Sequence, residues 1–132
     1  MKLLRVILPT TDIEKAARFY GAVLDADGIR VSPGRHYFDC EGTILACFDP
    51  RADGDGRDAQ PNPEHIYFAV NDLERVYRAV RQAGALFPEE SAPGVGPMGE
   101  IVTRPWGERS FYANDPFGNN LCFVAHETLF TG

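Results

Sequence analysis

Few cysteines are present, and their spacing excludes two ways of stabilising a small protein. Cys40, Cys47 and Cys122 are three in number, and no two of them form a CxxC pair. Neither a disulfide framework nor a structural zinc site is expected, because the first needs paired cysteines and the second needs closely spaced ligands. We expect buried thiols in strands.

Long apolar runs are missing too. No stretch approaches the roughly 20 apolar residues that a membrane-spanning helix needs. Met1 to Arg5 is not followed by the apolar core of a signal peptide. The expected location is the cytoplasm, with no membrane partner.

The chain also lacks an excess of positive charge. Its 13 Lys and Arg are dispersed among 19 Asp and Glu, which gives a formal net charge of -6. Nucleic-acid binding needs a clustered basic face, so a small molecule is the expected partner and nucleic acid is not. GxSxG, P-loop and HExxH motifs are absent from the sequence, which leaves hydrolase, nucleotide-binding and zinc-protease functions without support.

The first half of the chain predicts one strand, one helix and three more strands. Leu3 to Leu8 has strand composition. Thr11 with Glu14 predicts a capping box, after which a helix runs to about Asp25. Its apolar stripe recurs at helical spacing. The following strands are expected at Ile29 to Ser32, His36 to Asp39 and Thr43 to Phe48.

The second half repeats this order after an irregular segment rich in Asp, Gly and Pro. Glu64 to Val70 predicts a strand, and Asn71-Asp72-Leu73-Glu74 predicts a helix start. Gly84 ends that helix, and Pro88 to Gly99 is expected to be a loop. Three further strands are predicted at Glu100 to Arg104, Arg109 to Asn114 and Asn120 to Ala125.

The two halves align as a duplicated module. TDIEK in the first half lies against NDLER in the second, and Gly42 lies against Gly118. We expect an α+β protein with two tandem βαβββ modules, which form a curved mixed sheet with one helix per module on its outer face. The chain is predicted to be a single domain of residues 1–132, with modules at 1–50 and 64–126, a linker at 51–63 and a tail at 127–132.

Alternation along the strands predicts which side chains meet a helix. The wholly apolar faces should pack on the helices. The opposite faces should then carry mixed polar and aromatic groups, as ligand pockets do. The predicted members of that second face are Arg5, Ile7, His65, Tyr67, Asn120, Cys122 and Val124.

These motifs resemble the vicinal oxygen chelate superfamily, which includes glyoxalase I, extradiol dioxygenases and bleomycin-resistance proteins. The resemblance rests on RVILPTTDIEKAARFY, HIYFAVNDLERVYRAV and FYANDPFGNNLCFV, which come from both halves of the chain. It implies that paired βαβββ modules enclose one cavity, completed in many members across a homodimer. A homodimer is therefore expected, and the resemblance leaves open whether the cavity forms within one chain or between two.

Metal enzymes of that superfamily place ligands on the first and last strands of each module, and the resemblance maps these positions to Arg5, Ala46, His65 and Cys122. Arg5 has no lone pair to donate. Its charge, about 5 Å from a divalent ion at an effective dielectric constant of about 20, would repel the ion by roughly 7 kcal/mol. We expect no metal and no cofactor, although His65 and Cys122 could recruit zinc adventitiously.

The candidate site residues each have a functional and a structural interpretation. Arg5 is either a clamp for an anionic oxygen or a snorkelling or salt-bridged arginine near the N-terminus. His65 is either a general base or a satisfied core histidine, and Cys122 is either a nucleophile or an inert thiol. Trp106 is expected at a pocket rim. The predicted ligand-binding set is Arg5, Phe38, His65, Tyr67, Trp106, Phe111 and Cys122.

Three functions remain open. The preferred hypothesis is a metal-free protein that sequesters an aromatic or anionic compound, similar to the bleomycin-resistance members. The alternatives are a metal-dependent enzyme of the glyoxalase or dioxygenase type, and a metal-free lyase or isomerase with His65 as base and Arg5 to hold an enolate.

Overall fold

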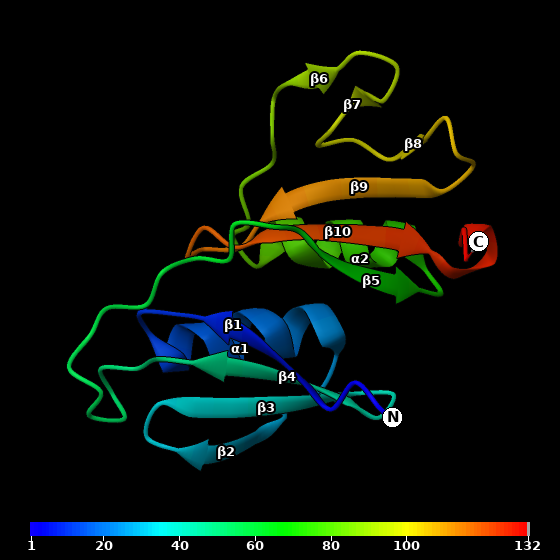
Figure 1. The fold of residues 1–132 in the computed structure, drawn as a ribbon. Coiled ribbons are helices and arrows are strands. Elements are labelled where there is room, and N and C mark those ends of the chain that lie inside the picture. Colours follow the sequence, from blue (N-terminus) through cyan, green and yellow to red (C-terminus); the bar gives the residue numbers. More distant parts are fainter. Residues whose placement is uncertain (132) are drawn as a thin grey trace. The chain divides into compact units, whose positions relative to one another are not determined.

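The computed structural model describes residues 1–131, which form two compact units (Figure 1). The first unit is Met1–Asn62 and the second begins at Pro63. This boundary falls at the end of the predicted linker. Each unit contains one α-helix and one four-stranded sheet, and each is described by itself below.

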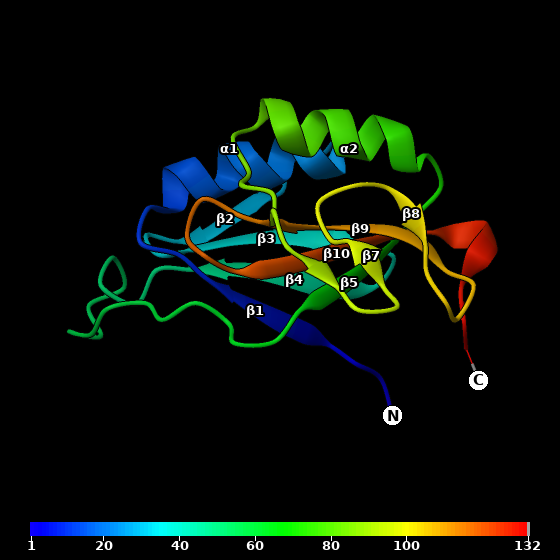
Figure 2. The ribbon, with the colours of Figure 1, turned by 90° about the horizontal axis from the view of Figure 1, so that it is seen from above.

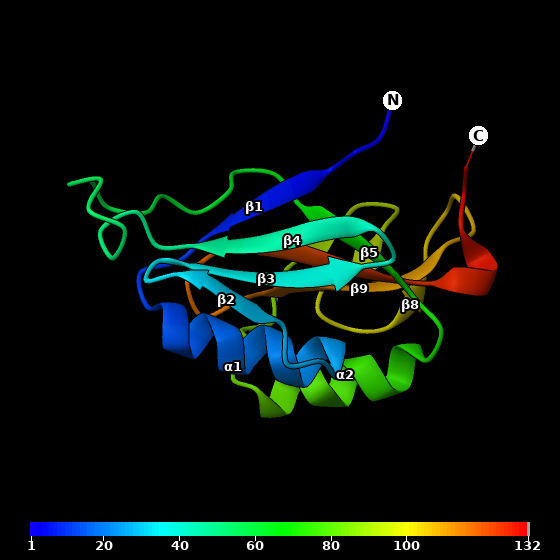
Figure 3. The same ribbon diagram turned by 90° about the horizontal axis from the view of Figure 1, so that it is seen from below.

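The first unit has the order β1 (Arg5–Pro9), α1 (Ile13–Leu24), β2 (Ile29–Ser32), β3 (Arg35–Cys40) and β4 (Thr43–Phe48). The strands lie in the order β1-β4-β3-β2. β1 runs parallel to β4, and the other pairs are antiparallel. After β4, residues 49–63 form turns without a helix or strand (Figure 3).

The second unit repeats this topology. Its main elements are β5 (Ile66–Val70), α2 (Leu73–Gln82), β8 (Val102–Thr103), β9 (Arg109–Asn114) and β10 (Asn120–Ala125). The sheet order is β5-β10-β9-β8, with β5 parallel to β10. A short 3-10 helix, η1 (His126–Thr128), follows β10. The α+β class and the tandem βαβββ order are therefore confirmed.

Each helix covers one face of the sheet in its own unit (Figure 2). The face of each sheet that its own helix does not cover is called the helix-free face below. The two helices span 12 and 10 residues. Among residues 1–131, no helix is both long and apolar enough to cross a bilayer.

Both helices begin at an aspartate. The Asp12 side chain accepts a hydrogen bond from the Lys15 backbone N–H at 3.1 Å, so Asp12, and not the predicted Thr11, is the N-cap of α1. Asp72 caps α2 in the same way, through the N–H of Arg75 at 3.1 Å. Asp25, at φ 53°, ends α1 in the left-handed conformation.

Four strand predictions are corrected at their ends. β3 extends one residue further at each end than the predicted His36 to Asp39, and β5 starts at Ile66 and not at Glu64. The first strand starts at Arg5, because Leu3 and Leu4 are exposed and precede the regular pairing with β4. The predicted strand from Glu100 to Arg104 contracts to β8, since the chain turns where the Arg104 N–H donates to the Glu108 carbonyl at 2.7 Å. The predicted loop before it contains a two-stranded ribbon of β6 (Ser91–Ala92) and β7 (Gly96–Pro97).

Aromatic rings fill the space between α2 and its sheet. Phe123 stacks on Phe68 and on Phe111, each with ring centroids 5.1 Å apart. Tyr77 of α2 meets the Phe111 ring edge-on at 4.9 Å. Such contacts stabilise a core beyond the area that they bury. Phe111 is 0% exposed and lies on the helix side of the sheet, which corrects its predicted place among the ligand-binding residues.

Phe38 is corrected for the same reason. It is 1% exposed and pairs across β3 and β4 with buried Leu45. Its neighbour on the same face, His36, is hydrogen-bonded to Arg30, which pairs with Glu14 of α1. The prediction of buried thiols holds for Cys47 and Cys122, whereas Cys40 is half-buried.

Candidate functional site

Strand register places the predicted residues of the first unit on one face. Ile7 of β1 pairs with Ala46 of β4, and Ala46 pairs in turn with Tyr37 of β3. Arg5, two residues before Ile7, shares their side of the sheet because side chains alternate along a strand. These residues form the helix-free face of the first unit.

The same register recurs in the second unit. Tyr67 of β5 pairs with Cys122 of β10, and Cys122 pairs with Tyr112 of β9. His65 precedes β5 by one residue and lies on the side of Tyr67. Ala46 and Cys122 thus occupy equivalent places in the two modules, each between a first-strand residue and a third-strand tyrosine.

Arg5 lies over an aromatic ring. Its guanidinium carbon is 5.2 Å from the centroid of the Tyr37 ring, a distance at which the cation is attracted to the π face. In the described part of the chain, no carboxylate lies within ion-pair distance of Arg5, which is exposed. The salt-bridged form of its structural interpretation is therefore not found, and the exposed guanidinium over the Tyr37 ring fits both a clamp and a snorkelling arginine.

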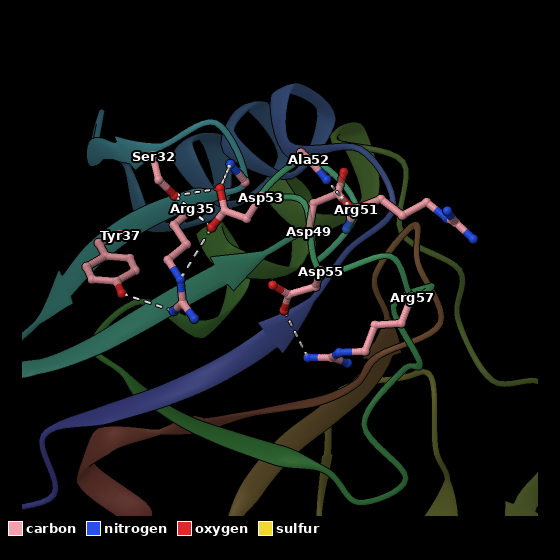
Figure 4. A network of polar contacts seen from close by, with 10 residues as sticks. Ser32, Arg35, Tyr37, Asp49, Arg51, Ala52, Asp53, Asp55 and Arg57 are labelled. Carbon is pink, nitrogen blue, oxygen red and sulfur yellow. Dashed lines mark hydrogen bonds and ion pairs between the residues drawn. The ribbon is translucent and has the colours of Figure 1, made fainter.

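A polar network beside Tyr37 fixes the neighbouring arginine. The Arg35 guanidinium donates to the Tyr37 hydroxyl at 3.1 Å, lies 4.1 Å from the Phe48 ring centroid and pairs with Asp53 at 3.6 Å (Figure 4). Asp53 also accepts from Ser32 and from the backbone N–H of Gly34. Arg35 is therefore held by three side chains, whereas the contact described for Arg5 is the Tyr37 ring.

A tight turn sets the position of Cys122. Asp115 accepts hydrogen bonds from the backbone N–H groups of Phe117 and Asn119 through one carboxylate oxygen, and from the Asn119 side chain through the other. Gly118, at φ 91°, supplies the left-handed conformation that the turn needs. The turn joins β9 to β10 and fixes the register in which Cys122 faces Tyr112.

The surroundings of the Cys122 thiol make it unreactive. Burial raises its pKa to about 11, outweighing the nearby hydroxyl groups of Ser110 and Tyr112 and the positive charge of Arg104, which act in the opposite direction. Nucleophilic cysteines need a lowered pKa and access to solvent. Cys122 is 1% exposed and protonated near neutral pH, so the structural interpretation holds.

Three rings gather around Cys122. The imidazole of His65 meets the Tyr112 ring edge-on at 5.0 Å and lies 6.2 Å from the Tyr67 ring. Desolvation raises the pKa of Tyr112 to about 12 and also raises the pKa of Tyr67, so both remain protonated donors near neutral pH. Tyr67 is 61% exposed, whereas Tyr112 is 5% exposed, so Tyr67 is the more accessible of the two tyrosines.

Sequence reasoning missed Arg104, a buried arginine behind this cluster. It is 2% exposed, and its guanidinium carbon lies 5.2 Å from the Tyr112 ring centroid. Its five N–H groups donate to the Ser110 hydroxyl and to four backbone carbonyls, those of Val95, Pro97, Glu100 and Ser110. Among the described residues, no carboxylate pairs with it.

Trp106, predicted at a pocket rim, is 44% exposed. Its indole N–H donates to one carboxylate oxygen of Glu108 at 2.8 Å, and the other oxygen accepts from the Phe130 backbone N–H at 2.9 Å. Trp106 therefore lies beside the C-terminal segment. Within residues 1–131, no ring contact joins it to the cluster around Tyr112.

The residues at the four family ligand positions do not fit a metal. Arg5 and Ala46 have no donor atom for one, and the Cys122 thiol is held protonated in a buried site. His65 is then the one suitable ligand among the four, whereas catalytic zinc sites use three protein ligands. Among the described residues, no three His, Cys, Asp or Glu side chains come together to form a metal site.

Comparisons with known proteins agree with this fold. A glyoxalase/bleomycin resistance protein from Albidiferax ferrireducens T118 is 21% identical, with a TM-score of 0.72 over 92% of this chain and 96% of that one. A glyoxalase-related enzyme from Fulvimarina pelagi is 17% identical, with a TM-score of 0.74 over 100% and 93%. Lactoylglutathione lyase from Agrobacterium tumefaciens is 20% identical, with a TM-score of 0.65 over 94% and 92%.

At these identities the three structures show that the fold is shared, and they do not show that an activity is shared. No curated protein sequence matches the chain. The sequence profile of the Glyoxalase/Bleomycin resistance protein/Dioxygenase superfamily, however, matches residues 2–123. Because this match covers most of the chain, the chain belongs to the glyoxalase/bleomycin resistance protein/dioxygenase superfamily.

Proposed function

We propose that this protein binds a small aromatic or anionic compound and uses no metal at the four family positions. The observation that supports this most directly is the residue set at those positions. At three of the four positions an exposed guanidinium, a methyl group and a buried protonated thiol stand in place of metal ligands, and only His65 offers an imidazole. Such groups bind a ligand without the need for a metal or a catalytic residue.

The chemistry around those positions favours an aromatic or anionic ligand. Tyr37 and Tyr112 each present a ring on a helix-free face, and each ring has an arginine at 5.2 Å. Aromatic rings bury the apolar surface of a ligand, and a cation orients its negative group. A protein that sequesters a compound needs these two features and no catalytic group.

Isothermal titration calorimetry of the untagged protein tests the proposal. The panel contains benzoate, 1-naphthoate, 1-naphthalenesulfonate, 4-nitrophenol and the neutral 1-naphthamide. We expect at least one anionic aromatic compound to bind, and Arg5→Met or His65→Ala to weaken it. No binding across the panel would contradict the proposed function.

Metal analysis of the same protein separates this proposal from a metal-dependent enzyme. Near-stoichiometric iron, zinc, nickel or manganese that is lost in His65→Ala would overturn the metal-free proposal. A metal-free lyase or isomerase would instead show turnover that survives a chelator and is lost in His65→Ala. That alternative needs His65 as the general base, and the His65 ring lies against the rings of Tyr67 and Tyr112.

A homodimer is part of the proposal, since the resemblance led us to expect the cavity to be completed by a second copy. Size-exclusion chromatography with light scattering measures the mass in solution. A mass of one chain at the concentrations used for calorimetry would contradict the dimer and leave the binding proposal unaffected.

A further inference from the structure

The Tyr37 hydroxyl, on the helix-free face of the first unit, has a proton that its hydrogen bond does not use. The Arg35 guanidinium donates to this hydroxyl at 3.1 Å (Figure 4). A guanidinium has donors and no acceptor, so the hydroxyl acts as the acceptor in this bond. Among residues 1–131, no carbonyl or carboxylate takes the remaining proton. Tyr37 is partly exposed, so its O–H is left to donate to a group outside the chain.

Arg35 sets the direction in which this O–H points. The Arg35 guanidinium is itself paired with Asp53 at 3.6 Å and lies 4.1 Å from the Phe48 ring centroid. A donor in this fixed place occupies one lone pair of the hydroxyl oxygen and keeps the O–H proton pointing away from itself. Donation from a cation also polarises the hydroxyl, because hydrogen bonds in a chain strengthen one another. Arg35 is thus a positioning residue, and Tyr37 is the donor that it orients.

Arg5 brings a positive charge to the same ring. Its guanidinium carbon lies 5.2 Å from the Tyr37 ring centroid, and within the described part of the chain no carboxylate is at ion-pair distance from it. The charge of Arg35, by contrast, is paired with Asp53. Asp39 lies on this face too, but one of its oxygens already accepts from a backbone N–H. The groups left to a ligand at the ring are therefore a cation and a neutral hydroxyl, and both donate hydrogen bonds.

Exposed apolar side chains lie beside the ring. Strand register places Ile29 of β2 and Ala46 of β4 on either side of Tyr37. Ile7 of β1 follows beyond Ala46. Residues paired in this way point to the same face of a sheet. Ile29 is 71% exposed and Ile7 is 37% exposed. The face therefore offers an aromatic ring and two isoleucines to the apolar part of a ligand, next to a cation and a hydroxyl donor.

We propose that the Tyr37 O–H and the Arg5 guanidinium together bind the carboxylate of an aromatic ligand. A carboxylate has two acceptor oxygens and no proton to donate, which matches two donors. The ring of the ligand then packs on Tyr37, Ile7 and Ile29. This inference rests on the proposed binding function. It specifies the ligand class and adds Tyr37 as a residue that determines specificity.

The probes are 1-naphthoate and 1-naphthamide, which have nearly the same shape and differ in the group that meets the two donors. The amide is neutral, and its NH2 group is a third donor placed against them. Because hydrogen bonds to a charged acceptor are roughly twice as strong as neutral ones, the full-length protein should bind the carboxylate about tenfold more tightly at neutral pH. Isothermal titration calorimetry measures both affinities. Equal affinity, or tighter binding of the amide, would overturn the inference.

Two variants locate the preference. Tyr37→Phe removes the hydroxyl and keeps the ring that Arg5 contacts. It should weaken 1-naphthoate about tenfold and 1-naphthamide by no more than about threefold, because only the carboxylate loses a charge-assisted bond. Tyr77→Phe is the matched control, since the Tyr77 hydroxyl also accepts from an arginine, Arg81, at 2.5 Å. Tyr77 belongs to α2 and packs on the helix side of the second sheet, so both affinities should stay unchanged. Thermal unfolding checks the fold of each variant.

The outcomes separate the inference from the proposed function. An undiminished preference for the carboxylate in Tyr37→Phe, or an equal loss in Tyr77→Phe, would show that the carboxylate is bound elsewhere and would overturn the inference. The comparison of carboxylate and amide in the unmodified protein tests the inference without any variant. Binding of 1-naphthalenesulfonate but of neither carboxylate in the calorimetric panel would overturn it too and leave the proposed function standing. Failure of the whole panel would reject the proposed function itself.

Discussion

Tyr37 and Tyr112 occupy equivalent places in the two modules. Tyr37 pairs with Ala46 and Tyr112 with Cys122, the corresponding positions on the last strands. A residue at the start of β1 or just before β5 contacts the ring of the tyrosine in its module. The Arg5 guanidinium carbon lies 5.2 Å from the Tyr37 ring centroid, and the His65 ring centroid lies 5.0 Å from that of Tyr112. The two modules thus place different groups against equivalent tyrosines, a guanidinium in the first and an imidazole in the second.

Replacing Arg5 by Met should weaken binding of an anionic aromatic ligand about five- to thirtyfold without destabilising the fold. Arg5 is exposed and its described contact is the Tyr37 ring, so the loss falls on the ligand. A cation over an aromatic ring contributes about 1–2 kcal/mol when desolvated. Calorimetry with 1-naphthoate measures the affinity, and thermal unfolding checks the fold. Unchanged affinity would exclude Arg5 from the ligand site.

Removal of the Arg104 guanidinium should cost far more stability than removal of a surface arginine. Arg104→Met leaves four backbone carbonyls and the Ser110 hydroxyl without their donor in a buried place, for an expected loss of about 2–4 kcal/mol in the free energy of unfolding. Arg78→Met, on the exposed side of α2, should change it by less than about 0.5 kcal/mol. Urea unfolding of both variants measures the difference. Equal effects would show that the Arg104 contacts contribute little.

The burial of Arg104 shows where sequence reasoning fails. Arginine is usually exposed, so composition predicts a surface position. Its partners are mainly backbone carbonyls of a loop rich in glycine and proline. Every residue has such a carbonyl, so the residue types of the loop do not indicate that an arginine is buried there. By contrast, the limits of β2, β4, β9 and β10 were predicted correctly, because alternation and turn residues are local signals.

The position of Phe111 in the core follows from alternation along the strands and from the turn between β9 and β10. Alternation along β10 correctly turned Phe123 toward the helix and Cys122 away from it. The turn at Asp115 to Gly118 fixes the β9–β10 register, which pairs Phe111 with Phe123 and Tyr112 with Cys122. Carrying the alternation across that turn would have placed Phe111 in the core and added Tyr112 and Ser110 to the candidate site.

His36 should exist as the neutral tautomer with its proton on Nε2. Arg30 Nε can only donate, and it lies 3.3 Å from Nδ1, which must therefore accept. Nε2 lies 2.9 Å from the Asp27 carbonyl, which needs a donor. Nitrogen-15 NMR of the imidazole distinguishes the two tautomers. A proton on Nδ1 would contradict the Arg30 contact, and in Arg30→Met the Asp27 carbonyl should keep the proton on Nε2.

Alkaline pH should destabilise the fold through Cys122. The folded protein holds its pKa at about 11 against an ordinary value of 9.0, so the unfolded thiol ionises first as pH rises. Below about pH 9 both states keep the proton and the thiol adds no pH dependence. Between about pH 9 and pH 11 the unfolded state loses its proton more readily, and the free energy of unfolding should fall by on the order of 2–3 kcal/mol.

Cys122→Ala isolates this contribution. The variant loses some packing at every pH, but its stability should decline less than that of the unmodified protein between pH 9 and pH 11. Tyr112, whose pKa is raised to about 12, continues to lower the stability of both proteins toward still higher pH. Urea unfolding at a series of pH values gives the two slopes. Parallel slopes would mean that Cys122 ionises in the folded protein as easily as in the unfolded chain, and the thiol would then have to be reconsidered as a reactive group.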